Sequence, residues 1–481
     1  MPHRAVTLAA LLLVSATAAA EGPDEATLRL KQRLAQLAGQ RLGGRLSYAV
    51  MDLKTGALLA AHAEDRPAPV ASCVKLVTSS TALALLGPEF RIKTVLYAAR
   101  RDGGVVEGDL HLKGFGDPTL REGHLWRMVQ DLYDLGVREV RGGVVVDDTH
   151  FDRHLLAPLF RSNRTDRHYR APIGAVSINE NGVSVRVVPG PAPGQPASVI
   201  LQPRSRYLKL VNRVRTVGPR RRSFIDVKTK GAGDATLVIV SGRVRTGYAS
   251  KWVRRRIEHP SLLAGYTLLD LLAERGIKVA QERVRRGATP AGVRPVATRY
   301  SPPLAVLVRH MNKVSSNFVA EQLLKVIGAE VSGPPGSAAK GLKAVAQHLA
   351  GAGVPPGSYL MLNGSGLYKS NRFTAAQLVR LLRAAHLDFR YGQELASSLA
   401  VAGVDGTLGH RLARTGAKRL IRAKTGTLAN VISLAGYAGT ASGKGLLAFA
   451  ILASELPSSR LLAARHRADE MARAMVAYLE R

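Results

Sequence analysis

Three short motifs of chemically active residues follow one another along this chain of 481 residues. Ser72 and Lys75 form an S-x-x-K motif, Ser315 and Asn317 form an S-x-N motif, and a K-T-G motif occupies 424–426. A hydroxyl nucleophile, an amine that can act as its base and a second amine that can hold a carboxylate are the parts of a serine acyl-transfer site. Such chemistry also needs donors for the oxyanion that forms in the transition state.

Ser72 and Lys75 are expected on one face of a helix, because helical side chains three residues apart are neighbours. Pro69 ends the preceding stretch, and the following apolar run stops at Gly87-Pro88, so the helix should begin near Ser72. Free N–H groups and the positive dipole end at a helix N-terminus would favour the nucleophile. Lys75 can accept a proton only when neutral, a state that burial and a nearby cation would both promote.

The segment 419–428, which contains the K-T-G motif, is predicted to be a strand, with further strands at 431–437 and 446–453. On such a strand Lys424 and Thr425 would bind a substrate carboxylate. Gly426 would let the substrate backbone approach the strand edge.

The remaining roles are assigned to a hydroxyl, an amide and backbone groups. Ser315 would relay a proton to the leaving group, and Asn317 would orient the substrate and Lys75. The backbone N–H groups of Ser72 and Thr427 would stabilise the oxyanion.

Each motif also occurs a second time, so order and context must select among the copies. Ser337 begins another S-x-x-K, a second K-T-G lies at 54–56, and Ser177 begins another S-x-N. The K-T-G at 54–56 falls at a predicted hairpin turn and precedes every candidate serine, while Ser337 follows the S-x-N motif. Only the set that begins with Ser72 has the required order with its last motif on a strand.

The flanks of the motifs carry a family resemblance. Its segments are V-A-S at 70–72, L-G-P-E-F-R at 86–91, G-F-G-D-P-T-L at 114–120, N-K-V-S-S-N-F-V-A-E-Q-L-L-K at 312–325, G-S-G-L at 364–367, V-A-G-V-D-G-T-L at 401–408 and A-K-T-G-T-L at 423–428. The chain resembles the D-alanyl-D-alanine carboxypeptidase/endopeptidase family of class C low-molecular-mass penicillin-binding proteins, peptidase family S13. The resemblance runs from about Leu30 to the C-terminus. The long separation between Ser72 and Ser315 is itself a mark of the family, and related β-lactamases have no comparable insertion.

The resemblance implies an α/β (α+β) penicillin-binding fold like that of the serine β-lactamases and transpeptidases, with a large, mostly-β insertion. Helices would cover a central antiparallel sheet, and a helical subdomain would carry Ser315 and Asn317. The implied activity is that of a serine DD-peptidase, which removes the terminal D-Ala of peptidoglycan stem peptides or cleaves the D-Ala–diaminopimelate cross-link. Ser72 would form the acyl-enzyme, and penicillins would acylate the same serine. No metal or organic cofactor is implied.

Two positions depart from the family pattern. Val70 stands where the family usually has Pro, and Asn363 stands where it usually has Asp. Neither departure removes a catalytic group, so they affect only fine substrate preference.

The catalytic domain is expected to be discontinuous, with residues 21–90 and 299–481 on either side of the insertion. The Pro/Gly-rich segment 189–196 is read as a boundary within that insertion. The family resemblance implies that residues 91–194 and 279–298 form a second domain, with a basic third domain, 195–278, nested inside it. A helix is predicted at 261–277 and another at 461–479.

The N-terminus is read as a secretory signal peptide, residues 1–20, with a basic start, an apolar core at 5–14 and small residues before a cut after Ala20. Its apolar run is too short to span a bilayer. We therefore expect export to the bacterial periplasm, where peptidoglycan lies.

Cys73 is the one cysteine of the chain, so no intramolecular disulfide can form. It neighbours the proposed nucleophile, and either a catalytic thiol or a small packed residue would fit there. The second interpretation is preferred, because no motif places a histidine beside it. The adjacent Asp147 and Asp148 end a Val-rich strand, where they would form a turn or recognise the substrate's diaminopimelate amino group, in preference to general acid/base work.

The net charge is +34, and residues 201–290 contain 21 Lys/Arg against 6 Asp/Glu. Nucleic acid is the usual partner for such a balance, but the export signal and the lack of a nucleic-acid motif argue against it. An anionic polymer of the envelope, such as peptidoglycan carboxylates or outer-membrane lipid, fits better. Arginine drift in an Ala/Gly/Arg-rich coding background would explain the charge without any partner.

Two other functions are compatible with the same sequence. A β-lactamase or esterase would use the same catalytic residues, although the insertion argues against it. A non-catalytic envelope scaffold would bind anionic polymer through 201–290, although the intact Ser72, Lys75 and Lys424 argue against that. The sequence indicates no oligomeric state and no balance between carboxypeptidase and endopeptidase activity.

Overall fold

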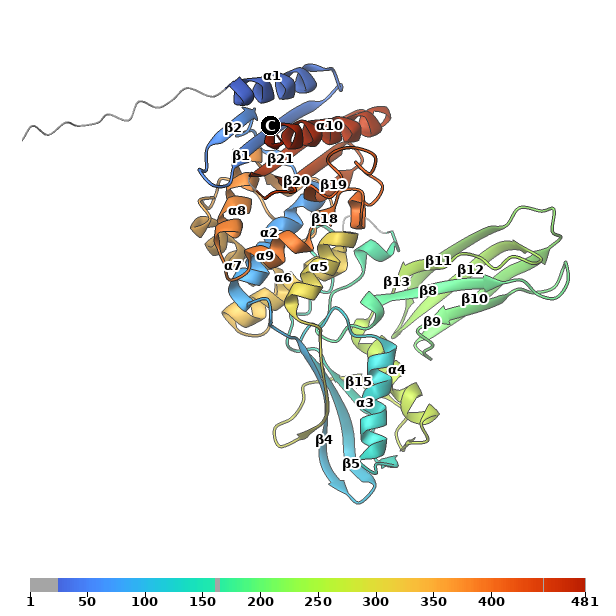
Figure 1. Ribbon diagram of the computed structural model, residues 1–481. Coiled ribbons are helices and arrows are strands. Elements are labelled where there is room, and N and C mark those ends of the chain that lie inside the picture. Colours follow the sequence, from blue (N-terminus) through green and yellow to red (C-terminus); the bar gives the residue numbers. More distant parts are fainter. Residues whose placement is uncertain (1–24, 161–164, 444, 481) are drawn as a thin grey trace, which may run out of the picture.

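The computed structural model describes residues 25–160, 165–443 and 445–480. Figure 1 shows three parts: a helix-covered sheet formed by both ends of the chain, a second sheet flanked by two helices, and a strand-built lobe that projects sideways. The predicted signal peptide, residues 1–20, lies outside the described residues. No helix within the described part of the chain is long and apolar enough to cross a membrane.

The central sheet joins the beginning of the chain to its end. Its strand order is β18-β19-β20-β21-β1-β2, and β1 (Arg45–Asp52) pairs antiparallel with β21 (Leu446–Ser454). The other members are β2 (Leu58–His62), β18 (Ala400–Val401), β19 (Ile421–Leu428) and β20 (Val431–Gly439). The predicted N-terminal hairpin and the three predicted C-terminal strands are confirmed.

Helices cover both faces of this sheet. On one face α1 (Glu25–Gly39) and α10 (Leu461–Leu479) bury Leu34 and Met471 in a shared apolar cluster, and α10 has the predicted bounds. The other face carries α2 (Val74–Leu86) and α8 (Ala375–Leu387). Beyond them lie α5 (Leu304–Val314), α6 (Asn317–Ser332), α7 (Ala338–Gly351) and α9 (Gly392–Ser398).

Helix α2 is a core helix, because ten consecutive residues from Val74 to Leu83 are all buried. It ends at Gly87, whose φ of 84° is in the region that favours glycine, as the Gly-Pro stop predicts. Each fully buried Leu or Val contributes about 1.5–3 kcal/mol. The start of this helix, beside Ser72, is therefore held in place by a buried apolar core.

The insertion begins with a second sheet. Strands β4 (Lys93–Asp102) and β5 (Val105–Gly114) form a long hairpin, joined by β6 (Glu139–Val140) and β7 (Val144–Asp147). The returning strands β14 (Lys278–Val279), β15 (Val284–Arg286) and β16 (Arg294–Tyr300) pair with β6, β7 and β4.

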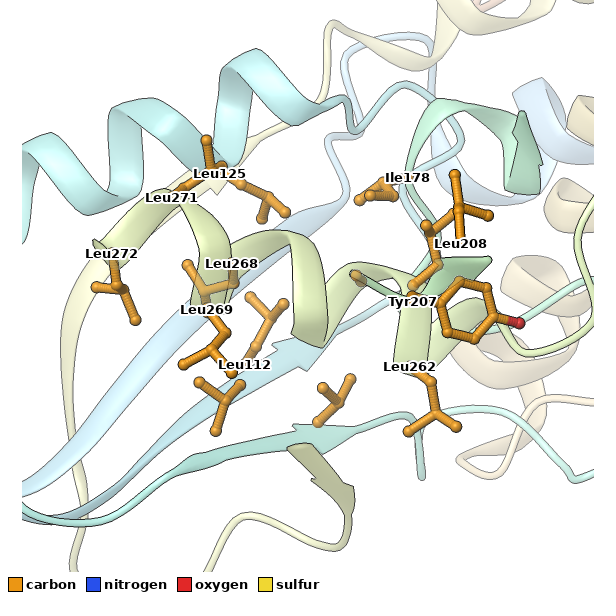
Figure 2. Close-up of a cluster of buried hydrophobic side chains, with 14 of the residues drawn as sticks. Leu112, Leu125, Ile178, Tyr207, Leu208, Leu262, Leu268, Leu269, Leu271 and Leu272 are labelled. Carbon is orange, nitrogen blue, oxygen red and sulfur yellow. The ribbon is translucent and has the colours of Figure 1, made fainter. Parts of the chain in front are cut away.

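Two helices pack on this sheet through a leucine-rich core. Leu125 of α3 (Glu122–Asp134), Leu268 and Leu272 of α4 (Pro260–Glu274) and Leu112 of the sheet belong to one buried apolar cluster, shown in Figure 2. Helix α4 ends before the predicted residue 277, because Gly276 adopts a left-handed φ of 82°.

The projecting lobe consists of residues 182–256, folded as two three-stranded sheets. Strands β10 (Leu208–Val217), β12 (Ala235–Arg245) and β11 (Phe224–Ala232) form one sheet in that order. The other has the order β13-β8-β9, with β8 at Gly182–Val188, β9 at Ser198–Gln202 and β13 at Val253–Arg256.

The strand topology is relevant to the predicted boundaries of the third domain, after 194 and at 278. The segment 189–196 connects β8 to its own antiparallel partner β9, so it is a loop within one sheet. Helix α4, assigned to the third domain, shares its core with α3 and β5. The pairing therefore favours moving the boundaries to about 181 and 257, which we propose as revised limits of the third domain.

Candidate active site

Ser72 lies in a short 3-10 turn, η1 (Ala71–Cys73), that leads directly into α2. The preceding Ala71 has a φ of 46°, a strained value for a residue with a side chain. Its carbonyl packs against Gly366, where an added Cβ would lie 1.9 Å from the Ala71 oxygen. Close backbone packing thus keeps Ser72 in a fixed position on the buried helix.

Lys75 connects the nucleophile to two other segments. Its Nζ donates hydrogen bonds to Ser72 Oγ at 3.0 Å, to Asn317 Oδ1 at 2.8 Å and to the Ser365 carbonyl at 2.6 Å. The side chain is 0% exposed. The structure therefore brings Ser72, Lys75 and Asn317 together, although 242 positions separate the last two.

The charge state of Lys75 follows from this environment. Burial, and then the neighbouring cation of Lys424, lower the pKa of Lys75 well below its usual value, while Glu321 opposes this shift. A neutral amine 3.0 Å from a serine hydroxyl is placed to accept its proton.

Ser315 links α5 to α6 in a left-handed conformation, with φ 59° and ψ 41°. Its hydroxyl accepts a hydrogen bond of 2.9 Å from Lys424 Nζ, which also donates to the Thr425 carbonyl at 2.8 Å. Burial lowers the pKa of Lys424 to about 8. At neutral pH Lys424 therefore remains mostly a cation, as binding of a carboxylate requires.

A hydrogen bond from Asn317 connects the site to the insertion. Asn317 begins α6, and its Nδ2 donates to the carbonyl of Tyr169 at 3.3 Å. Ser316, between the two S-x-N residues, caps α6 by accepting from the Val319 N–H. The oxygen of the Asn317 amide thus binds Lys75, and its nitrogen binds the insertion.

The K-T-G strand, β19, presents a free edge beside the nucleophile. One side of it pairs with β20 along its whole length, whereas β18 pairs only with Arg422 and Ala423 on the other. In the described part of the chain, 424–428 has no strand partner on that second edge. Thr425 is half-buried, with its hydroxyl 2.8 Å from that of Thr407, and Thr427 is exposed. An extended peptide can pair with such an edge through main-chain hydrogen bonds.

Gly426 is required by the protein's own packing. An added Cβ would lie 2.2 Å from Ser433 Oγ and 2.8 Å from the Val70 carbonyl. Those two groups are themselves hydrogen-bonded at 2.8 Å. The strand and the segment before Ser72 thus meet at a position that admits only glycine. This internal packing explains the glycine differently from the sequence-based prediction, which was close approach of the substrate backbone.

Cys73 is fully buried, and its Sγ lies 3.2 Å from the Lys424 carbonyl. Burial raises the pKa of the thiol, which disfavours the thiolate needed for nucleophilic attack. The environment favours the packed-residue interpretation of Cys73.

Glu321 also belongs to the site, although the sequence predicted no role for it. This buried carboxylate accepts the N–H groups of Gly364 at 3.1 Å and Ser365 at 2.9 Å, and so positions the Ser365 carbonyl that binds Lys75. Burial raises the pKa of Glu321. The available signal was its spacing, four residues after Asn317 on one helix face.

The duplicate motifs have structural tasks elsewhere. Ser337 caps α7 by accepting from the Lys340 N–H at 3.1 Å, and the Ser177 hydroxyl donates to the Gly174 carbonyl at 2.7 Å. The K-T-G at 54–56 forms the exposed turn between β1 and β2, where the Thr55 N–H donates to Asp52.

Asp147 acts as a turn residue. It accepts hydrogen bonds from Thr149 and Thr289 and lies 3.1 Å from Lys113 Nζ. Burial alone would raise the pKa of Asp147, but these hydrogen bonds hold it below its usual value. Asp148 accepts a hydrogen bond from Ser261. Of the two sequence interpretations, these contacts favour the turn.

Comparison with known proteins relates this geometry to a family. The model of the D-Ala-D-Ala carboxypeptidase 3 (S13) family matches residues 29–475. The chain belongs to this family. It is 33% identical to a D-alanyl-D-alanine carboxypeptidase of Actinomadura sp. (strain R39) over 85% of this chain and 78% of that one. It is 24% identical to the D-alanyl-D-alanine carboxypeptidase DacB of Haemophilus influenzae, over 78% of each chain.

Two solved structures share the fold of this chain. Penicillin-binding protein 4 of Haemophilus influenzae superposes with a TM-score of 0.77 at 21% identity, covering 94% of this chain and 99% of that one. A predatory peptidoglycan endopeptidase of Bdellovibrio bacteriovorus, acylated by penicillin G, gives 0.51 at 16% identity over 90% and 93%. The predicted penicillin-binding fold is confirmed, and family membership confirms the predicted class, a serine-type D-Ala-D-Ala carboxypeptidase.

Proposed function

We propose that this S13 member is a serine DD-peptidase that works through an acyl-enzyme on Ser72. The observation that carries the proposal is the 3.0 Å hydrogen bond between Lys75 and Ser72, made by an amine that is buried beside a second cation. Burial and that neighbour both favour a neutral amine, which the first step requires.

In the first step Ser72 Oγ attacks the carbonyl carbon of the scissile D-Ala peptide bond while Lys75 accepts the hydroxyl proton. The backbone N–H groups of Ser72 and Thr427 stabilise the resulting oxyanion. When the C–N bond breaks, Ser315 donates its proton to the leaving amine and takes up the proton that Lys75 had accepted, so Lys75 becomes neutral again. The hydrogen bond from Lys424 holds the Ser315 hydroxyl for this relay. Water then attacks the ester while Lys75 accepts its proton, and return of that proton to Ser72 Oγ releases the shortened peptide and restores the serine.

Substrate binding uses the open edge of β19. Lys424 and Thr425 hold the terminal carboxylate, Asn317 orients the acyl chain through its amide, and the edge at 424–428 pairs with the extended peptide. A β-lactam presents a carboxylate and a strained amide in the same arrangement, so it acylates Ser72 as well. The stem-peptide carboxypeptidase and the cross-link endopeptidase reactions both fit this scheme.

Peptidoglycan as a substrate agrees with a periplasmic location, which we propose together with the signal peptide at 1–20 and cleavage after Ala20. The excess of positive charge in residues 201–290 supports an additional anionic partner in the envelope.

Labelling with a fluorescent penicillin tests the proposal. The mature protein should be labelled stably, the Ser72→Ala variant should lose the label, and Ser337→Ala, which alters the second S-x-x-K, should keep it. Rapid hydrolysis of the penicillin with no stable label would indicate a β-lactamase. Absence of both label and hydrolysis, in a protein that folds, would contradict an acyl-enzyme altogether.

A further inference from the structure

The three loops at the far end of the projecting lobe gather in one place. Strands β10 and β12 are parallel and so end at the same side, where β11 begins. The Thr246 N–H donates to the Val217 carbonyl at 2.9 Å, and the Gly194 N–H donates to the Thr216 carbonyl at 2.9 Å. In Figure 1 this lobe points away from the helices around the active site. We call residues 189–197, 213–224 and 243–252 the lobe tip.

The lobe tip carries positive charge without compensation. Seven of its arginines are exposed: Arg213, Arg215, Arg220, Arg221, Arg222, Arg243 and Arg245. The stretches 187–224 and 235–257 contain no Asp or Glu. Within the described residues, none of the seven has an ion-pair partner. A cationic surface of this kind attracts anions over about a Debye length.

Three consecutive arginines at the base of the lobe, by contrast, have ion-pair partners. At the base of the lobe Arg254 lies 3.2 Å from Glu180, Arg255 lies 3.4 Å from Asp166, and Arg256 lies 3.1 Å from Glu258. These three arginines stabilise the junction with the rest of the chain. The arginines at the base are thus used within the protein, whereas those at the tip are free to bind a partner.

Exposed aromatic rings lie among the tip arginines. Phe224 is 65% exposed and pairs across strands with Arg243, while Trp252 is 43% exposed. Tyr248, also exposed, has the Arg245 guanidinium 4.9 Å from its ring centre. Phe224 therefore gives the cationic tip an exposed apolar group beside its arginines.

We propose that the lobe tip docks on the surface of an anionic phospholipid bilayer. Arginines pair with lipid phosphates, and aromatic rings prefer the level of the headgroups, where one side is apolar and the other wet. A soluble polyanion would use the arginines but not Phe224. This names the partner of the anionic-binding region proposed above, and it does not depend on the peptidase activity. Docking at the tip would leave the β19 edge open to the cell wall.

Sedimentation with vesicles tests the docking. The mature protein should bind phosphatidylglycerol vesicles, should not bind phosphatidylcholine vesicles, and should be released by salt. The triple variant R220E/R221E/R222E should weaken binding at least about tenfold, because each basic residue near an anionic surface contributes to binding. The matched control R41E/K343E/R380E makes the same charge change at exposed positions of the catalytic domain and should bind normally.

The aromatic contribution is tested separately. Phe224→Ser should weaken vesicle binding with little change in its salt dependence. Trp126→Phe leaves Trp252 as the one tryptophan of the chain, and its emission should shift to shorter wavelength when vesicles are added. Penicillin labelling should remain unchanged in all these variants, which shows that they are folded and separates this test from that of the peptidase.

Two results would overturn the proposal. One is failure to bind phosphatidylglycerol vesicles at low salt by protein that still reacts with penicillin. The other is binding to long-chain polyphosphate as tight as binding to vesicles, with no effect of Phe224→Ser on either, which would indicate a polymer partner.

Discussion

The Nζ of Lys424 and the hydroxyl of Ser315 are hydrogen-bonded at 2.9 Å across 109 positions of sequence. This contact joins the strand edge, which would hold the substrate, to the loop between α5 and α6 that also positions Asn317. Because Lys424 also lowers the pKa of Lys75, one cation influences both the carboxylate site and the base. The predictions below use this coupling.

The rate of acylation should have a bell-shaped pH dependence. Protonation of Lys75 removes the base, so kcat/KM should fall as the pH drops below the lowered pKa of that lysine. Above about pH 8 Lys424 loses its charge, so kcat/KM for carboxylate-bearing substrates should fall again. Stopped-flow kinetics from pH 5 to pH 10 measures both limbs, and a flat profile would contradict the roles of both lysines.

Lys424→Met should shift the acidic limb to higher pH. The variant removes the neighbouring cation that lowers the pKa of Lys75, so Lys75 stays protonated, and inactive as a base, up to a higher pH. It should also raise KM for peptides ending in a free carboxylate. If the limb stays in place while KM rises, Lys424 binds substrate without affecting the base.

Glu321→Gln should shift the acidic limb in the opposite direction. Glu321 favours the ammonium form of Lys75, so its neutralisation should lower the pKa of that lysine further. The variant also gives the N–H groups of Gly364 and Ser365 a poorer acceptor, at a cost of about 1–3 kcal/mol in the free energy of unfolding. The pH profile and urea denaturation report the two effects separately. A limb that moves upward would contradict the assigned electrostatics.

Lys75→Met should reduce the rate of acylation by about 10²–10⁴-fold, the usual contribution of a general base, while the protein stays folded. Lys340→Met is the matched control, because Lys340 occupies the same place in the second S-x-x-K and only donates to the Gly333 carbonyl. Its acylation rate should equal that of the unaltered protein. Equal rates for both variants would exclude Lys75 as the base.

Gly426→Ala should be more harmful than an ordinary surface substitution on a strand. The new Cβ would overlap Ser433 Oγ at 2.2 Å and force β19 away from the segment before Ser72. Overpacking typically costs about 1–3 kcal/mol. We expect a lower melting temperature together with slower acylation. Gly426→Ala/Ser433→Ala removes the closest clashing atom and should recover part of the stability, and failure to do so would show that the Val70 carbonyl sets the limit.

Much of the fold was predictable because its signals are local. The hairpin at the start of the chain, the three strands after 419 and the helix at 461–479 follow from periodicity and turn residues. The boundary at 194 needed more than local signals, because a Pro/Gly-rich segment can equally connect two paired strands, as it does between β8 and β9.

By itself the sequence determined the chemistry available to this protein: a serine, two lysines and an asparagine in an order that only one set of motifs satisfies. Tertiary structure decided what those groups can do. The lowered pKa of Lys75 depends on burial and on Lys424, which lies 349 positions away, and no local pattern encodes either. The need for glycine at 426 comes from Ser433 and Val70 on other segments. The charge also depends on folding. The sequence gives the number of arginines in 201–290, but only the structure shows which are paired at the lobe base and which are exposed at its tip.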